Sequence, residues 1–311
     1  MKLSQQAIAV LQAFFVTVLW ASSWVLIKLG LRADLPALTF AGLRYTLAFL
    51  CLAPFVLLSR RNRAVIQSFT RRDWMRLALL GIVYYTLTQG AQFLSLAYLP
   101  AATASLLLNL TPLVVGVSGI VFLREYPSRS QWGGITLTIL GVAVFFLPLT
   151  MGVVSVIGLL LAFGGVLGNA ASSLLGRQVN RLANSSPLVI TFISMGIGSV
   201  VLLVVGVIFQ GFGQLDLQAW LFIAWLAVVN TAFAFTLWNH TLRTLSAVES
   251  SVINSLMMPQ IAILAYVFLG ETLSGREVFG LILVSLGVIV VQLKKKQSRR
   301  QEEASALSRA N

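Results

Sequence analysis

Charged residues are scarce in this sequence of 311 residues. They make up 10% of the chain, hydrophobic residues make up 58%, and the mean hydropathy is +0.90. A soluble domain of ordinary composition carries about 25% charged residues. Because this chain lacks the charges that cover a water-facing surface, its composition excludes an ordinary soluble domain. We expect most of its surface to face hydrocarbon.

Chemically reactive side chains are also scarce. The sequence has one histidine, one cysteine and nine acidic residues. It contains no GxxxxGK[ST] loop and no HExxH or GxSxG motif, so we expect neither ATP-driven transport nor an intramembrane hydrolase. Cys51 is alone and cannot form an intramolecular disulfide. We therefore expect no enzymatic activity, no cofactor and no metal site.

The excess of basic residues points to a membrane rather than to nucleic acid. The formal net charge is +13, but the lysines and arginines lie in short segments between apolar runs, chiefly 60–72 and 294–300. Clusters of this kind mark the cytoplasmic loops of membrane proteins. The expected partners are therefore a lipid bilayer and a small-molecule substrate, and not DNA or RNA.

Ten apolar runs are long enough to be membrane spans. A helix needs about 20 apolar residues to cross the bilayer core, and the runs lack the alternation of apolar and polar residues that is typical of barrel strands. The sequence thus predicts an all-α integral membrane protein with ten transmembrane helices. The predicted spans are 7–29, 36–58, 74–97, 101–123, 131–148, 153–176, 187–209, 217–239, 247–269 and 278–293.

The distribution of basic residues predicts the orientation of these spans. With the N-terminus in the cytoplasm, nearly every loop cation falls on the cytoplasmic side, and the other side keeps only Arg32 and Arg276 in its loops. We expect an inner-membrane protein with both termini in the cytoplasm. Residues 294–311 are expected to form a basic, disordered cytoplasmic tail.

The sequence also contains an internal repeat. Residues 122–146 align with residues 268–292 at a shift of 146, with phenylalanine, leucine, glutamate and glycine at matching places. This predicts two halves, 1–148 and 149–293, of five spans each. Because five is odd, the second half is expected to be inverted relative to the first, an arrangement that recurs in secondary transporters.

Glycines at regular spacing predict close contacts between helices, because small residues let helix backbones approach. Gly134 and Gly141 in the fifth span recur as Gly280 and Gly287 in the tenth. Gly164 and Gly168 form a further pair in the sixth span. Gly133, next to Gly134, belongs to the same set. We expect all seven to lie at helix contacts.

Several segments resemble one family. They are LWASSWVLIKLGL (19–31), LTFAGLRYTLAFLCLAPF (38–55), LNLTPLVVGVSGIVFLREYPS (108–128) and GETLS (270–274). In order and spacing the chain is similar to the ten-helix, EamA-like transporters of the drug/metabolite transporter superfamily. The resemblance implies export of amino acids or related metabolites. Some relatives carry an acidic residue before the proline at 259, where this chain has Met258, so a carboxylate-coupled mechanism is not implied.

Polar side chains within predicted spans are candidates for a substrate site, because such groups are costly in hydrocarbon. Arg44 lies about 12 Å into the second span at 1.5 Å per residue. It would either pair with a substrate carboxylate or bind the carbonyls at the end of a neighbouring helix. Trp20 and Trp24 share a face of the first span with Lys28, which we expect to extend to the outer interface. The two indoles would either line a pocket or pack against lipid and helices.

The remaining candidates for substrate binding lie in the third, fourth, sixth and eighth spans. The asparagines among them would bind substrate or join helices by amide hydrogen bonds. These candidates are Tyr85, Gln89, Gln92, Asn109, Asn169, Asn230 and Trp238.

Glu249 is the one acidic residue that we place within a span. Ser246 and Glu249 have the spacing of a capping box, so Glu249 would either cap the ninth span or couple transport to protons.

We conclude that the sequence predicts a secondary transporter or facilitator, monomeric or homodimeric, for small amphipathic metabolites such as aromatic or apolar amino acids. A membrane scaffold and a lipid flippase are the alternatives. A transporter would gather its polar residues around one cavity, whereas a scaffold would bury them in pairs.

Overall fold

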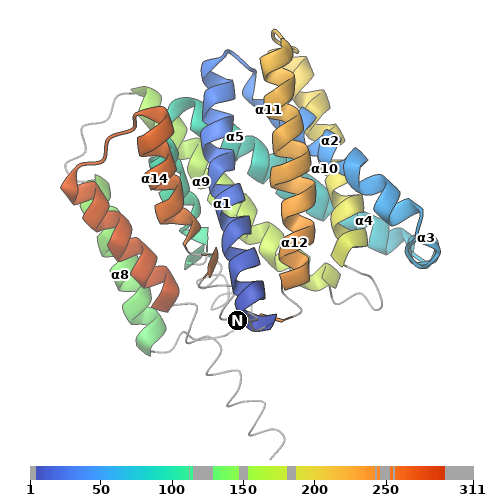
Figure 1. The fold of residues 1–311 in the computed structure, drawn as a ribbon, viewed down its shortest axis with the longest axis horizontal. Helices are drawn as coiled ribbons and strands as arrows, with labels where there is room; N and C mark the ends of the chain where they lie inside the picture. Colours follow the sequence, from blue (N-terminus) through green and yellow to red (C-terminus); the bar gives the residue numbers. More distant parts are fainter. Residues whose placement is uncertain are drawn as a thin grey trace, which may run out of the picture.

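The first helix, α1 (Gln5–Arg32), has 28 residues and is apolar over most of its length. At 1.5 Å per residue it is about 42 Å long, which is more than the bilayer core of about 30 Å requires. The N-terminal end of α1 lies at one end of the bundle and its C-terminal end at the other (Figure 1).

The structure is a computed structural model that describes residues 5–111, 113–114, 129–146, 153–180, 187–241, 244–245, 253–254 and 256–290. Every regular element in these ranges is a helix, so the expected all-α fold is confirmed for them. After α1 come α2 (Ala37–Leu57), α3 (Arg60–Gln67), α4 (Arg71–Gly81), η1 (Ile82–Thr88), α5 (Gln89–Tyr98), α6 (Ala101–Leu108), α8 (Arg129–Phe146), α9 (Val153–Asn180), α10 (Pro187–Gln210), α11 (Leu217–Ala227), η2 (Val228–Phe233), α12 (Ala234–Thr241), α14 (Met257–Leu269) and a helix over 275–290.

Six helical stretches of the described residues are long and apolar enough to cross a membrane, and two shorter apolar helices accompany them. These eight coincide with predicted spans, which makes the chain a multi-pass membrane protein. Ten spans stay a prediction, because the expected fourth span and the basic tail fall largely outside the described residues. The six long stretches are Gln5–Arg32, Ala37–Leu57, Arg71–Tyr98, Val156–Gly176, Pro187–Gln210 and Leu217–Trp238.

Two of the spanning stretches are interrupted by π-helices at matching places. η1 begins at Ile82 and η2 at Val228, a difference of 146, which is also the shift of the sequence repeat. The hydroxyl of Thr88 donates to the carbonyl of Val83 (2.8 Å), five residues back, and a threonine of η2 makes the same kind of bond. π-Helices are rare and often occur at functional sites, so this pair directs attention to the middle of the bundle.

Helices α2 and α10 pack closely against each other. Phe49 stacks on Phe192 with ring centroids 4.7 Å apart. A Cβ added to Gly42 would lie 2.5 Å from the Leu203 Cα, so the two backbones nearly touch there. This contact holds the opposite side of α2, which carries Arg44, toward α1 and η2.

The repeated glycines bring α8 and the helix over 275–290 together. A Cβ on Gly141 would lie 2.8 Å from the Gly280 carbonyl oxygen, and a Cβ on Gly287 would lie 2.7 Å from the Gly134 carbonyl oxygen. Gly141 thus faces Gly280, which is the repeat counterpart of Gly134. Gly287, the repeat counterpart of Gly141, faces Gly134. Reciprocal contacts of this kind are what a two-fold relation between two helices produces.

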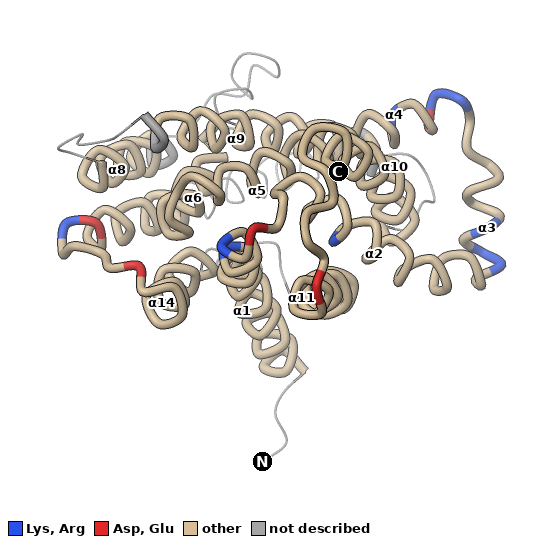
Figure 2. The backbone as a smooth tube through the Cα atoms, turned by 90° about the horizontal axis from the view of Figure 1, so that it is seen from above, with Lys and Arg blue, Asp and Glu red and all other residues tan. Residues whose placement is uncertain are grey.

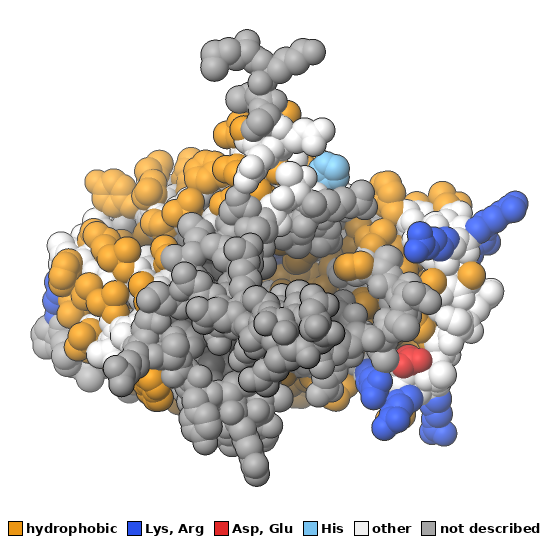
Figure 3. Space-filling view, turned by 90° about the horizontal axis from the view of Figure 1, so that it is seen from below, with side chains coloured by type: hydrophobic (Ala, Val, Ile, Leu, Met, Phe, Trp, Pro, Cys, Tyr) orange, Lys and Arg blue, Asp and Glu red, His pale blue; other side chains and the backbone are white. Residues whose placement is uncertain are grey.

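Charged residues lie mainly at helix ends and along α3 and α4 (Figure 2). Apolar side chains cover much of the rim seen from below, and arginines gather at one edge, over α3 and α4 (Figure 3). Val65, Ile66 and Phe69 pack against the main apolar core, so α3 is a short amphipathic helix at the edge of the bundle. Its arginines and those of α4 are Arg60, Arg61, Arg63, Arg71, Arg72 and Arg76.

Candidate functional site

Arg44 is buried in the middle of the bundle, with 5% of its surface exposed. It lies seven residues after the start of α2, about 10 Å along the helix. Its Nε donates to the Thr231 hydroxyl of η2 (3.2 Å), and its Nη2 lies 3.5 Å from the Ser23 hydroxyl of α1. The guanidinium thus joins three helices through hydroxyl groups.

No described carboxylate forms an ion pair with Arg44. Four of the described acidic side chains accept hydrogen bonds from backbone amides at helix starts, and Asp34 lies in the loop after α1. A buried cation that has only neutral partners is costly in a low-dielectric interior. Among the described residues, Arg44 is therefore the group best suited to receive an anion. The four capping acids are Asp73, Asp216, Glu271 and Glu277.

Aromatic rings surround the guanidinium of Arg44. Its Cζ lies 5.0 Å from the centroid of the Tyr45 ring and 6.0 Å from that of Phe93, within the range of cation–π contacts. The Tyr45 hydroxyl donates to Gln89 Oε1 (2.7 Å), and the Tyr45 ring packs edge-on against Tyr85 at 5.5 Å. Tyr85 and Gln89, both predicted site residues, are thus tied to Arg44 through Tyr45.

Asn230 of η2 lies next to this cluster and is fully buried. Its Nδ2 lies 3.0 Å from each of the hydroxyls of Ser22 and Ser23 and also bonds the Leu19 carbonyl. Its Oδ1 accepts no hydrogen bond from the part of the chain that the structure describes. A buried polar atom without a partner costs about 1–3 kcal/mol, so Asn230 keeps an acceptor available to a ligand.

Trp20, at the middle of α1, and Trp238 of α12 form a second group. Their ring centroids are 5.1 Å apart, and Phe235 lies 5.3 Å from Trp20. The indole Nε1 of Trp20 is buried and donates to no described group. Gln260 of α14 donates to Thr17 of α1 (3.2 Å), while its buried Oε1 has no partner among the described residues. This aromatic group thus contains an unused donor and lies close to an unused acceptor.

The other predicted site residues make no hydrogen bond to Arg44 in the described part of the chain. Trp24 packs in the main apolar core, which also holds Tyr45 and Phe93, and not in the cluster that Trp20 joins. Gln92 is half-buried on α5, and its side chain makes no hydrogen bond to a described residue. Asn109 donates to a carbonyl of its own helix (2.8 Å), and Asn169 of α9 donates to a threonine hydroxyl after α6 (3.2 Å). Glu249 lies outside the described residues.

Lys28 of α1 makes two hydrogen bonds to the end of α5. Its ammonium donates to the carbonyls of Leu96 (2.5 Å) and Leu99 (2.7 Å), and the final carbonyls of a helix lack partners within that helix. Its extension to the outer interface stays a prediction. Lys28 thus caps the C-terminal end of a helix, whereas Glu271 caps an N-terminal end. The Glu271 carboxylate accepts a hydrogen bond from the Ala101 amide (2.8 Å) at the start of α6.

Several residues of the Arg44 cluster were not predicted from the sequence. Tyr45 follows Arg44 directly, and neighbouring positions on a helix normally point in different directions. Ser22 and Ser23 lie in the segment LWASSWVLIKLGL (19–31), and their uncharged hydroxyls gave no sign of a role in a site. The adjacent polar pair of Asn230 and Thr231 within the apolar run VVNTAF was the one available signal for the η2 residue that binds Arg44.

Comparison with known proteins places the chain among membrane transporters. It matches the EamA-like transporter family over residues 7–147 and again over 156–293. It is 29% identical over 294 residues to an uncharacterized transporter, YvbV, of Bacillus subtilis (strain 168), covering 94% of this chain and 93% of that one. A probable amino-acid metabolite efflux pump of Salmonella typhimurium (strain LT2) is 28% identical over 292 residues, covering 89% and 92%.

Two further similarities extend over nearly the whole chain. A probable terminal-alkyne amino-acid exporter of Streptantibioticus cattleyicolor is 27% identical over 316 residues, covering 97% of this chain and 98% of the relative. One solved crystal structure of a protein aligns with a TM-score of 0.66 at 18% identity, covering 92% of this chain and 97% of its own. The second likeness establishes a shared fold.

Proposed function

The chain belongs to the EamA-like transporter family, and on that premise we propose that it exports small amphipathic metabolites by alternating access. Amino acids with aromatic or apolar side chains, or their analogues, are the favoured cargo. Two of the relatives described above carry names that refer to amino-acid efflux or export, which supports this class of substrate.

The observation that carries the proposal is the burial of Arg44 among hydroxyl groups and aromatic rings without a described carboxylate. A cargo carboxylate would supply the missing negative charge through charge-assisted hydrogen bonds. Tyr85 and Gln89 would help to form the wall on one side. The unpaired Oδ1 of Asn230 would accept a hydrogen bond from a cargo amino group.

Trp20 and Trp238 are proposed to receive the apolar part of the cargo. The two rings lie 5.1 Å apart, and the indole N–H of Trp20 is unused, so this group combines apolar surface with one donor. We retain Trp24, Gln92, Asn109 and Asn169 as further candidates for substrate binding, although no hydrogen bond or ring contact links them to Arg44 among the described residues.

We propose that the transporter consists of two inverted halves, residues 1–148 and 149–293. Three observations support this division: the two family matches, the π-helices 146 residues apart, and the reciprocal glycine contacts of α8. The Arg44 cluster takes residues from α1, α2 and η1 of the first half and from η2 of the second. A site between inverted halves is the arrangement from which alternating access arises in such transporters.

We also propose that the protein lies in the inner membrane with both termini in the cytoplasm. If α1 and α2 cross the bilayer one after the other, the arginine-bearing α3 and the start of α4 come on the same side of the membrane as the N-terminus. Both helices lie together at one edge of the bundle (Figure 1). A concentration of arginines at one end is typical of the cytoplasmic side.

Transport can be tested with purified full-length protein in liposomes loaded with a mixture of radiolabelled amino acids. We expect protein-dependent efflux of a subset that is rich in aromatic and apolar members, measured against protein-free liposomes. A dependence on an imposed pH gradient that disappears in Glu249→Gln would assign proton coupling to that residue. If no amino acid leaves selectively while a fluorescent lipid crosses the bilayer, the flippase alternative replaces the proposal.

A further inference from the structure

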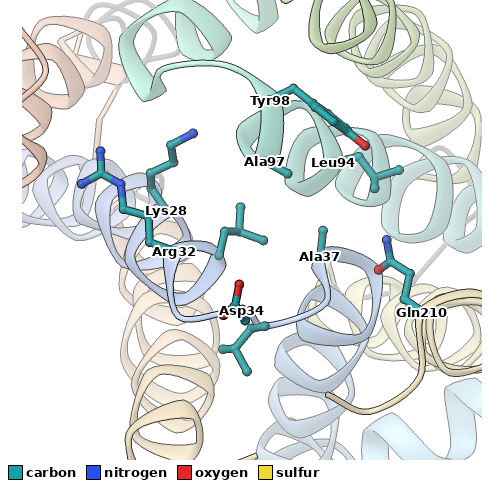
Figure 4. Close-up of a pocket in the computed structure, with 10 residues that line it drawn as sticks. Lys28, Arg32, Asp34, Ala37, Leu94, Ala97, Tyr98 and Gln210 are labelled. Atoms are coloured by element: carbon teal, nitrogen blue, oxygen red, sulfur yellow. The ribbon is translucent and has the colours of Figure 1, made fainter. Parts of the chain in front are cut away.

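A pocket lies at the end of the bundle opposite the N-terminus, and packed side chains separate it from Arg44. It has a volume of about 280 Å³ and lies between the end of α1, the start of α2, α5 and the end of α10 (Figure 4). Leu35 lines the pocket and packs with Phe40 over Gly30. The Phe40 ring meets Phe93 edge-on at 5.4 Å, and Phe93 contacts the guanidinium of Arg44. This row of apolar contacts closes that end of the bundle in the present conformation.

Helix α6 begins directly after a proline at the same end. Tyr98 of α5 lines the pocket, and α6 starts three residues later, after Pro100. The ring of Pro100 has no polar atom that could cap the helix. By contrast, α4 and α11 begin after Thr70 and Asp216, and the side chain of each accepts from an amide of its own helix. Because the first amides of a helix have no partners within it, those of α6 need an acceptor from another segment.

Glu271 supplies this acceptor from the second half of the chain. Its Oε1 accepts from the Ala101 amide (2.8 Å) and its Oε2 from the Ala102 amide (3.3 Å). Gly270 ends α14 with a φ of 67°, the left-handed conformation that turns the chain at a helix end. Glu271 follows this turn directly. The start of α6 is therefore held by a residue of the other proposed half, 170 positions away from Ala101.

Two cations at the end of α1 complete the set of charged contacts. Lys28 and Arg32 line the pocket from the last two turns of α1 (Figure 4). Arg32 donates to the Leu269 carbonyl at the end of α14 (3.2 Å), which is a second bond between the halves. The Lys28 ammonium, bonded to the end of α5, is attracted by Glu271 and repelled by Arg32. Cations at helix C-termini and an anion at a helix N-terminus each complement the helix dipole.

The two bonds between the halves lie where water can replace them. Arg32 is exposed, and Glu271 is half-buried at a helix end. Charged groups near water lose little free energy when they exchange a protein partner for solvent. Arg44, by contrast, is buried and has no such exchange at hand. The contacts of Arg32 and Glu271 can therefore break and form again at modest cost, which is what a gate requires.

We propose that Glu271 and Arg32 form a latch that holds the outer end of the transporter closed. The latch consists of the bonds from Glu271 to the start of α6 and from Arg32 to the end of α14. Release of both bonds lets the end of α14 separate from α1 and α6, which opens a way from Arg44 to the outer side. The latch presupposes the alternating access proposed above, in which the two halves move against each other.

The test measures how fast a buried thiol reacts from the outer side. Ser105 lies one turn inside α6 and is fully buried, so Ser105→Cys in a Cys51→Ser background reports the separation of α6 from its neighbours. A membrane-impermeant methanethiosulfonate reagent is applied to the full-length protein in right-side-out vesicles. Glu271→Gln keeps the size of the side chain and removes its charge. We expect it to raise the rate of modification about 5-fold or more, as the difference between a charged and a neutral hydrogen bond implies.

Glu277→Gln is the matched control. The Glu277 carboxylate accepts from the amide and the hydroxyl of Ser274 (2.7 Å each) at the start of its own helix. The substitution therefore weakens a helix cap of the same chemistry without touching the other half. The rate of modification in Glu277→Gln should equal that of the parent protein. An increase as large as that in Glu271→Gln would overturn the latch.

Pro100→Ser distinguishes a latch from a plain helix cap. Serine is a preferred N-cap residue, and Pro100 is exposed with a backbone that is already non-helical, so the substitution gives α6 a local cap. In the double variant Pro100→Ser, Glu271→Gln the modification should stay fast, because the bond between the halves is still missing. A return to the parent rate would mean that Glu271 only caps α6, and the latch would be wrong.

An unchanged rate in folded Glu271→Gln would also overturn the latch, and it would leave the proposed function intact, because efflux is measured separately with wild-type protein. Absence of efflux in the wild type would contradict the proposed function whatever the rate of modification. If Glu271→Gln does not fold, Arg32→Ala takes its place, since Arg32 is exposed. The rate should then rise about 2-fold or more, and a rate equal to that of the parent would overturn the latch.

Discussion

Arg44→Gln is expected to reduce the initial rate of amino-acid efflux at low cargo concentration by about 10- to 100-fold, since a hydrogen bond to a charged group is worth about 1.5–3 kcal/mol. Glutamine can still donate to the hydroxyls of Ser23 and Thr231, so the bundle should keep its fold. Arg44→Lys should retain part of the activity, because lysine keeps the charge but lacks the planar fork of arginine. Rates are measured in liposomes and normalised to the amount of folded protein.

The control for this variant is Arg276→Gln. Arg276 is exposed in the first turn of the helix over 275–290, so its loss should leave the efflux rate close to that of the wild type. If Arg44→Gln lowers the yield of folded protein but leaves the KM and the rate per folded molecule unchanged, Arg44 is a helix-joining residue and the assignment of the anion site is wrong.

Gly198→Leu is expected to have the largest effect on stability. A Cβ on Gly198 would overlap the Gly81 carbonyl oxygen and would lie 2.8 Å from the Tyr85 Cβ. The Gly198 carbonyl also accepts from the Thr86 hydroxyl (2.8 Å), so the backbones of α10 and η1 have no room to separate without losing this bond. Overpacking costs about 1–3 kcal/mol and sometimes more. We expect Gly198→Leu to lower the free energy of unfolding by about 3 kcal/mol or more, measured by thermal unfolding in detergent.

Gly164→Leu is the matched control on α9. A Cβ at Gly164 would meet nothing within 4 Å, and the position is exposed. Leucine also favours helix over glycine by up to about 1 kcal/mol, so this variant should be as stable as the wild type or slightly more stable. Equal destabilisation by the two substitutions would contradict the close contact of α10 with η1.

Most of the helical architecture was predictable, because long apolar runs have few alternatives in a bilayer. The predicted spans 7–29, 36–58 and 187–209 correspond to α1, α2 and α10 within a few residues. The glycine contacts of α8 were also anticipated from spacing. The prediction was wrong at Gly133 and Gly164, which are exposed and have nothing within 4 Å of an added Cβ, because glycine spacing identifies a narrow helix face and does not reveal whether another helix covers it.

The π-helices were not predictable. A π-turn requires one extra residue in a helical turn, and the apolar runs around Ile82 and Val228 show no break in composition that would reveal it. Once both are seen, the repeat shift of 146 pairs Tyr84 with Asn230 and Tyr85 with Thr231. The two helices therefore present different chemistry from equivalent places, aromatic rings from one and hydrogen-bonding groups from the other.

The candidate site was predictable in part. The depth of Arg44 in an apolar helix was enough to predict an interior position, and its burial confirms that position. Its neutral partners were not predictable, because serine and threonine are common in membrane helices and usually bond their own backbone. Asp34 and Gln210 fall just outside the predicted spans 7–29, 36–58 and 187–209, where polar residues are ordinary, and only the folded chain brings them to one pocket.

Alternating access of the Arg44 cluster is tested most directly by the reactivity of a single cysteine. The chain has one cysteine, so Cys51→Ser gives a background free of thiols, and Ser23→Cys places a thiol of similar size beside Arg44. We expect a membrane-impermeant methanethiosulfonate reagent to modify this buried position when applied from either side of the membrane, and exported cargo to slow the reaction. A folded protein that is never modified from either side would contradict the account, because the polar cluster would then be a static joint between helices.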